Sequence, residues 1–125
     1  MLKKSDLIKY FENGIKNTSE IKIGTEHEKF IYHKSDLSLV SYSGDVSISS
    51  IFDDFINDGW TPVEENENII ALNKDKASIT LEPGGQFELS GAPLKTIHET
   101  CKEINNHLAF TKKLEEKYNI ETEEN

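Results

Sequence analysis

Four short runs of strand-forming residues lie close together in the second half of the sequence, over 61–65, 69–73, 77–82 and 86–90. Short turns rich in Asn, Glu, Lys and Asp separate the first three runs, and a Pro-Gly-Gly segment precedes the last. A parallel connection between strands needs about a dozen residues or more, so neighbouring runs cannot pair in parallel. They therefore predict antiparallel hairpins, and this constraint does most to decide the fold class.

Three other segments have the 3.6-residue spacing of amphipathic helices, over about 5–13, 48–58 and 97–118. The segment 21–33 is rich in strand formers and predicts a further strand, and 37–42 is a candidate short strand in the loop that follows it. The apolar faces are predicted at Leu7, Ile8, Phe11 and Ile15, at Ile48, Ile51, Phe52, Phe55 and Ile56, and at Ile97, Cys101, Ile104 and Leu108.

This order of elements predicts an α+β fold, with helices packed on one face of an antiparallel, partly mixed sheet. The range 1–125 fits a single domain. A T-x-x-E capping box at Thr96 and Glu99 marks the start of the last helix. Trp60, which follows Gly59, is expected to anchor the corner between the second helix and the hairpins.

Composition narrows the classes of partner. The formal net charge of −9 opposes nucleic acid, because phosphates need Lys and Arg for neutralisation. No stretch approaches the roughly 20 apolar residues of a membrane span, so no membrane partner is expected. The single cysteine, Cys101, permits no internal disulfide and is expected to be buried and inert. These features favour a cytoplasmic protein, and the acids at 121–124 are expected to form a solvated tail.

The segment 78–91 breaks the usual rules for a strand. Glu82 and Glu88 flank a Pro83-Gly84-Gly85 corner, although strand interiors avoid acids, proline and paired glycines. Apolar residues stand beside both acids, and acids at the boundary of a core need partners. Converging carboxylates typically bind a hard cation such as Mg²⁺. The alternative is a plain hairpin corner with two exposed acids.

A second acidic pair lies in the predicted strand 21–33. Glu26 and Glu28 are two residues apart, so they share a face of the strand and stand about 7 Å apart. Two like charges at this distance repel unless a cation lies between them. Together the two pairs provide four oxygen donors for Mg²⁺ in phosphoryl transfer. The alternative is a solvent-exposed strand face that also carries Lys22, while His27 lies on the opposite face.

Three blocks of the sequence, 24–30, 59–62 and 81–94, resemble the plant and proteobacterial type of glutamate–cysteine ligase. The 81–94 block, Leu-Glu-Pro-Gly-Gly-Gln-Phe-Glu-Leu-Ser-Gly-Ala-Pro-Leu, is long and specific. The spacing between the blocks matches too, and so does the helix that begins at Thr96. The likeness covers nearly all of the chain.

The resemblance implies a glutamine-synthetase-like catalytic domain, in which a curved antiparallel sheet holds Mg²⁺ between strand carboxylates and receives ATP and glutamate. In such enzymes ATP phosphorylates the γ-carboxylate of glutamate, and the amine of cysteine displaces phosphate to give γ-glutamylcysteine, the first step of glutathione biosynthesis. By position, Glu26 and Glu28 are similar to the metal-binding Glu-x-Glu strand of the family, and Glu82 and Glu88 to its second acidic pair. Gly84, Gly85 and Gln86 are weaker candidates for substrate contact, and no catalytic residue is assigned.

The chain departs from the family in length, since members run to several hundred residues. All 14 basic residues are lysines, so the chain offers no bidentate arginine fork for phosphate. We therefore expect an N-terminal portion of the catalytic domain that is inactive alone. The missing C-terminal part, or a second polypeptide in a split enzyme, is the expected partner. The alternative is a non-catalytic acidic module that binds a divalent cation or a partner chain.

Overall fold

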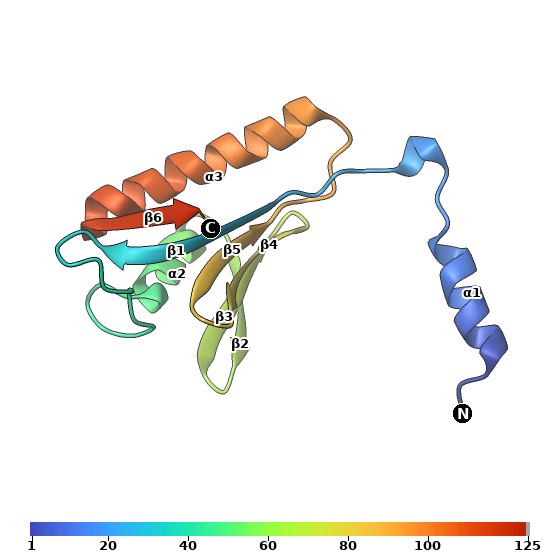
Figure 1. The fold of residues 1–125 in the computed structure, drawn as a ribbon, viewed down its shortest axis with the longest axis horizontal. Coiled ribbons are helices and arrows are strands. Elements are labelled where there is room, and N and C mark those ends of the chain that lie inside the picture. Colours follow the sequence, from blue (N-terminus) through green and yellow to red (C-terminus); the bar gives the residue numbers. More distant parts are fainter. Residues whose placement is uncertain (125) are drawn as a thin grey trace.

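A computed structural model describes residues 1–124, in which a six-stranded sheet packs against two helices (Figure 1). The strand order is β2-β3-β4-β5-β1-β6. The elements are α1 (Lys4–Gly14), a 3-10 turn (Thr18–Glu20), β1 (Glu26–His33), α2 (Ile48–Asn57), β2 (Thr61–Glu65), β3 (Asn68–Lys74), β4 (Ala77–Glu82), β5 (Gln86–Ser90), α3 (Ile97–Tyr118) and β6 (Ile120–Glu124). None of the helices in this range is long and apolar enough to cross a membrane.

All five neighbouring strand pairs are antiparallel, so the α+β prediction is confirmed, without the mixed component. Two-residue turns join β2 to β3 and β3 to β4, with positive φ at Asn66 and Glu67 (49° and 65°) and at Asp75 and Lys76 (49° and 74°). Turns with two positive φ values match the twist of the flanking strands and close hairpins tightly. The hairpins predicted from spacing are thus present.

The side of the sheet that faces the helices carries the core. Leu72, Ile79, Phe87 and Leu89 alternate inward and are almost completely buried. Phe87 lies between two aromatic rings of α2, with centroid distances of 5.8 Å to Phe52 and 5.7 Å to Phe55. The opposite face of the same strands carries the acids.

β1 is shorter than predicted, because regular pairing begins at Glu26 rather than at residue 21. Before it, Ile23 makes only an isolated bridge to Leu94. The candidate strand at 37–42 is a loop, and a single bridge joins Leu39 to Tyr32.

β6 corrects the prediction of a solvated acidic tail. Ile120–Glu124 pairs with β1, with Tyr32 opposite Glu121 and Phe30 opposite Glu123. Ile120 is fully buried, and the backbone N–H and hydroxyl of Thr122 both donate to Oε1 of Glu115, while Glu121 and Glu123 are exposed. The prediction considered only the number of acids in this segment. It overlooked that Ile and Thr alternate with acids, which is the two-residue period of a strand.

α3 buries a different face from the one predicted. Its buried residues are Thr100, His107, Thr111 and Leu114, whereas Ile97 and Cys101 are exposed. Successive helical residues are rotated by about 100°, so Thr100 inward turns Cys101 away from the sheet. The expectation of a buried Cys101 is therefore wrong. The capping box is confirmed, since the Thr96 hydroxyl accepts from the backbone N–H of Glu99 at 3.2 Å.

α1 forms where its spacing predicts, but it stands apart from the sheet in Figure 1. No residue of α1 is buried, and Leu7, Ile8 and Phe11 are exposed together with Ile15 just after the helix. Its amphipathic pattern therefore has no packing partner within the described residues.

Gly91 allows the chain between β5 and α3 to pass close to β1. A Cβ added there would collide with Oε1 of Glu103 and would lie 2.8 Å from Oγ1 and 3.1 Å from the backbone oxygen of Thr25. We expect Gly91→Ala to lower the free energy of unfolding by about 1–3 kcal/mol, as overpacking does, measured by urea denaturation.

Gly14→Ala is the matched control for this substitution. Nothing lies within 4 Å of a Cβ at Gly14, so its effect should stay within about 0.5 kcal/mol. Equal stabilities of the two variants would contradict the close approach at Gly91.

Candidate functional site

The four predicted carboxylates lie on the sheet face that points away from the core. Glu28 on β1 is directly opposite Glu88 on β5. Residues opposite each other in an antiparallel pair have Cβ atoms about 4.5–5.5 Å apart. Glu26 lies two residues before Glu28 on β1. On β4, Thr80 is the partner of Glu88, and Glu82 lies two residues after Thr80. The pairing places all four side chains on one face.

Glu88 is the centre of this arrangement. It faces Glu28 directly and is the diagonal neighbour of Glu26 on one side and of Glu82 on the other, at about 7–8 Å. Glu26 and Glu82 themselves lie roughly 13 Å apart along the strands, because their partners on β5, Ser90 and Gln86, are four residues apart. The structure thus brings Glu28 and Glu88 together and leaves the other two at the ends.

Two hydroxyl groups hold carboxylate oxygens on this face. The Thr80 hydroxyl donates to Oε1 of Glu82 at 2.9 Å, and the Ser90 hydroxyl donates to Oε1 of Glu88 at 2.7 Å. Glu82 and Glu88 are half-buried. No group of three or more acidic, histidine or cysteine side chains among the described residues is close enough to hold a metal by itself.

The donor set nevertheless suits Mg²⁺. This ion keeps several waters and binds one or two carboxylates together with substrate phosphates. Glu28 and Glu88 provide such a pair, and Glu26 and Glu82 lie within a diagonal step of it. Lys22 lies outside β1 and is exposed, so it is not part of this strand face as the alternative interpretation required.

The glycine corner lies at one end of the carboxylate face. Gly84 and Gly85 have φ values of 93° and 84° in the exposed turn between β4 and β5. No heavy atom lies within 4 Å of a Cβ built on either residue, so the turn is open. Gln86 is paired with Glu82 and points to the acidic face. The candidate substrate contacts therefore adjoin Glu82 and lie away from Glu26.

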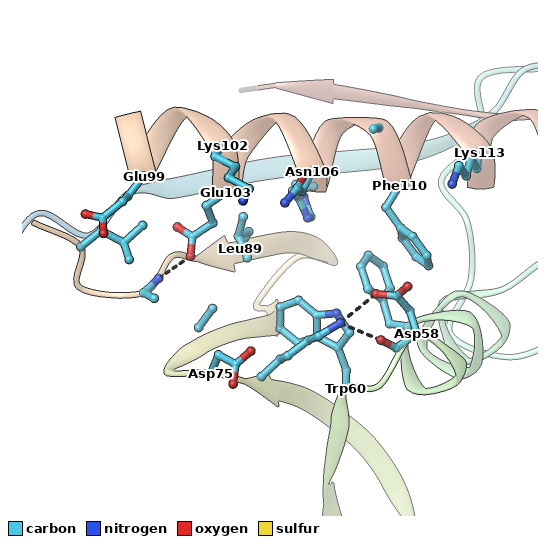
Figure 2. Close-up of a pocket in the computed structure, with 17 residues that line it drawn as sticks. Asp58, Trp60, Asp75, Leu89, Glu99, Lys102, Glu103, Asn106, Phe110 and Lys113 are labelled. Atoms are coloured by element: carbon cyan, nitrogen blue, oxygen red, sulfur yellow. Dashed lines mark hydrogen bonds and ion pairs between the residues drawn. The ribbon is translucent and has the colours of Figure 1, made fainter. Parts of the chain in front are cut away.

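A cavity of about 630 Å³ lies on the other side of the sheet, among α3, the end of α2 and the β3–β4 turn (Figure 2). Phe55, Trp60, Leu89 and Phe110 form much of its apolar wall. Trp60 packs edge-on against Phe55 with a centroid distance of 5.7 Å, as expected for a corner anchor. None of the four carboxylates lines this cavity.

Sequence reasoning missed two polar residues that face this cavity. Oε2 of Glu103 accepts a hydrogen bond from the backbone N–H of Ala92 at 2.9 Å (Figure 2). Oε1 of Glu103 and Nε2 of His107 are buried without a hydrogen-bond partner among the described residues. The two residues are one helical turn apart, and this i, i+4 spacing was the feature of the sequence that could have placed them on the same face of the helix. The apolar stripe at Ile104 and Leu108 concealed it.

His107 is neutral at physiological pH. Burial is the largest cause that lowers its pKa to about 4, and the nearby positive charge of Lys29 and the ring of His27 contribute in the same direction. Its ring stacks on Phe55 at a centroid distance of 6.2 Å and lies 6.4 Å from that of His27. The side chain therefore acts as part of the packing between α3 and the sheet, and His27 does face the helices as predicted.

Comparison with known proteins connects this sheet to a family. Residues 22–117 match the family model described as "Glutamate-cysteine ligase family 2(GCS2)". The chain is 46% identical to the chloroplastic glutamate–cysteine ligase of Medicago truncatula, over 95% of this chain and 23% of the relative. The corresponding proteins of Nicotiana tabacum and Arabidopsis thaliana are 45% and 44% identical, each over 95% of this chain and 22% of the relative.

The chain spans less than a quarter of the length of these relatives. The comparison also corrects the expected compartment, because the named relatives are all chloroplastic and not cytoplasmic. The observations behind the cytoplasmic prediction were one cysteine and no long apolar stretch. Neither feature is specific to the cytoplasm.

The buried His107 makes stability sensitive to acid. Its pKa is about 4 in the folded chain and near 6.5 when unfolded, so the unfolded state binds more protons between these values. The contribution of the neutral imidazole to the stability of the fold is complete above pH 6.5 and is lost as the pH falls toward 4. Lowering pH from 7 to 5 should cost the wild type about 2 kcal/mol through this group, measured by urea denaturation.

His107→Gln should lose that part of the pH dependence, because no group at this position then gains a proton. His98→Gln is the control, since His98 is an exposed histidine of the same helix and its loss should leave the pH dependence unchanged. The same loss of stability in wild type and His107→Gln would contradict a buried neutral imidazole.

Proposed function

Because the chain belongs to glutamate–cysteine ligase family 2, we propose that it supplies part of the metal-binding sheet of an ATP- and Mg²⁺-dependent ligase. The proposed reaction joins the γ-carboxylate of L-glutamate to the amine of L-cysteine, the first step of glutathione biosynthesis. The observation that carries the proposal is the register that sets Glu28 opposite Glu88, with Glu26 and Glu82 diagonal to Glu88. All four residues lie within the matched range 22–117.

In the proposed reaction the γ-carboxylate oxygen of glutamate attacks the terminal phosphorus of ATP, which gives γ-glutamyl phosphate and releases ADP. The cysteine nitrogen then attacks the acyl carbon, loses a proton, and expels inorganic phosphate. Mg²⁺ would be held by Glu28 and Glu88, with Glu26 or Glu82 as further ligands, and would neutralise phosphate charge. The strands contribute rigidity, because carboxylates fixed on a paired sheet keep their relative positions.

We further propose that the Gly84-Gly85 turn and Gln86 contact substrate. The open space around both glycines lets a ligand approach the backbone closely. The Gln86 side chain offers an amide donor and an acceptor beside Glu82. Because the turn adjoins Glu82, a substrate bound there would meet the acidic face from the Glu82 end.

Part of the catalytic apparatus must come from outside these 125 residues. They contain no arginine, whose planar fork suits bidentate phosphate contacts. The relatives are more than four times as long as the part matched. We propose that the remainder of such a ligase, in the same or a second polypeptide, provides the cationic groups for ATP and glutamate.

Divalent-cation binding tests the carboxylate site. Mn²⁺ should broaden amide resonances of β1 and β5 in NMR spectra. Replacing a ligand carboxylate should weaken binding by about tenfold or more, with Glu88→Gln at least as damaging as Glu28→Gln. Glu64→Gln is the control, because Glu64 is an exposed acid on the edge strand β2 and its loss should change little.

These variants also separate a ligand role from misfolding. Like charges directly opposite in a sheet repel, so Glu28→Gln should raise the metal-free stability by a few tenths of a kcal/mol up to about 1 kcal/mol. Unchanged Mn²⁺ affinity in both Glu28→Gln and Glu88→Gln would refute the proposed metal site. Cation binding without any role in ligation would favour the non-catalytic acidic module.

The purified chain of 125 residues should not catalyse the ligation alone, since it lacks phosphate-binding arginines. The measurement is ADP release in the presence of ATP and Mg²⁺, with and without glutamate and cysteine. ADP release that depends on both amino acids would show that the chain is sufficient and would refute this expectation.

A further inference from the structure

We infer that Thr80 and Ser90 are positioning residues for the carboxylate face. Each hydroxyl holds one oxygen of a glutamate on its own strand, so that the second oxygen stays free for a cation. This inference rests on the proposed function, because it assigns a role to groups that adjoin the proposed metal ligands without contacting the metal themselves.

The contacts are direct and similar on the two strands. Ser90 Oγ donates to Glu88 Oε1 at 2.7 Å on β5, and Thr80 Oγ1 donates to Glu82 Oε1 at 2.9 Å on β4. In both pairs the residues are two apart and therefore share a face. Both distances lie in the usual range for O–H···O hydrogen bonds, and that of Ser90 is as short as a charge-assisted bond to a carboxylate.

The two hydroxyls occupy central places in the network of acids. Thr80 is the direct partner of Glu88 across the β4–β5 pair and is two residues from Glu82, so it is adjacent to both glutamates that the hairpin provides. Ser90 is the direct partner of Glu26 across the β1–β5 pair, so it separates Glu26 from its neighbours on β4. Each donor thus holds one carboxylate and stands beside another.

Hydroxyl groups suit this task better than amines. A lysine in either place would hold a carboxylate but would also neutralise its charge and compete with a cation. A neutral donor orients the carboxylate and leaves its charge available. The β-branched side chain of Thr80 adds stiffness, because it restricts χ1. Groups that orient metal-binding side chains typically change metal affinity by 10–100-fold when they are removed.

The test compares Thr80→Val and Ser90→Ala with Thr80→Ser, following Mn²⁺ affinity by electron paramagnetic resonance and by amide broadening. Valine keeps the shape of threonine and removes the donor, whereas serine restores it. We expect about tenfold weaker binding for Thr80→Val and for Ser90→Ala, and affinity close to wild type for Thr80→Ser. Thermal unfolding midpoints of the variants should remain close to one another.

Ser78→Ala is the matched control. Ser78 lies on the same face of β4, two residues from Thr80 and directly opposite Ser90, and no hydrogen bond joins its hydroxyl to a carboxylate within the described residues. Its removal should leave Mn²⁺ affinity unchanged. A loss as large as that of Ser90→Ala would show a general effect of polarity and would overturn the assignment.

The carboxylate variants separate this inference from the proposed function. If Glu88→Gln weakens Mn²⁺ binding while Thr80→Val and Ser90→Ala bind as well as wild type, the metal site stands and the positioning role is refuted. If the wild-type chain and every variant fail to bind Mn²⁺, both are refuted. If Thr80→Val loses affinity and Thr80→Ser does not, the donor itself is responsible, as inferred.

Discussion

The burial of Phe87 and Leu89 determines where every acid on the sheet points. Both side chains are almost completely buried, and the Phe87 ring packs against Phe52 and Phe55 of α2. Because successive strand residues point to opposite faces, this fixes Glu88 on the outer face. A slip of β5 by one residue would exchange the two faces and place a carboxylate against the aromatic rings of α2. The core therefore sets the register, and the register sets the site.

The acidic face is an electrostatic cost that the core offsets. Glu28 and Glu88 stand directly opposite each other, an arrangement that destabilises an antiparallel pair. Hydrogen bonds from Thr80 and Ser90 satisfy single oxygens of Glu82 and Glu88, but they leave the negative charge in place. The molecule retains this repulsion on a rigid sheet instead of placing lysines among the acids. The proposed cation site requires an arrangement of this kind, in which the acids keep their charge.

Sequence reasoning succeeded where one local rule decided the outcome. The hairpins followed from turn length, α2 from its apolar stripe, and the start of α3 from the capping box at Thr96. The shared face of Glu26 and Glu28 followed from a period of two. That Glu88 lies between these residues and Glu82 did not follow, because it depends on the pairing of β1 with β5, two strands far apart in the sequence.

The failures have physical causes of the same kind. In α3 the side chains against the sheet are Thr100, His107 and Thr111. Hydrophobicity alone therefore selected the wrong face and predicted that Cys101, which is exposed, would be buried. The acids of β6 looked like a tail because their charge outweighed Ile120, which the core buries completely. In each case a tertiary contact overrode a local average.

The two faces of the sheet place ionisable groups in different surroundings. On the helix side, where Lys29 is also buried, burial keeps His107 neutral with a pKa of about 4. On the outer face, Glu28, Glu82 and Glu88 are only half-buried, so water can solvate them when no ligand is bound. With a formal charge of −9 on the chain, an anionic nucleotide can approach this face only when cations or basic groups stand between them. In the proposed ligase, a cation on the carboxylate face and basic groups from the rest of the enzyme would together offset this repulsion of the nucleotide.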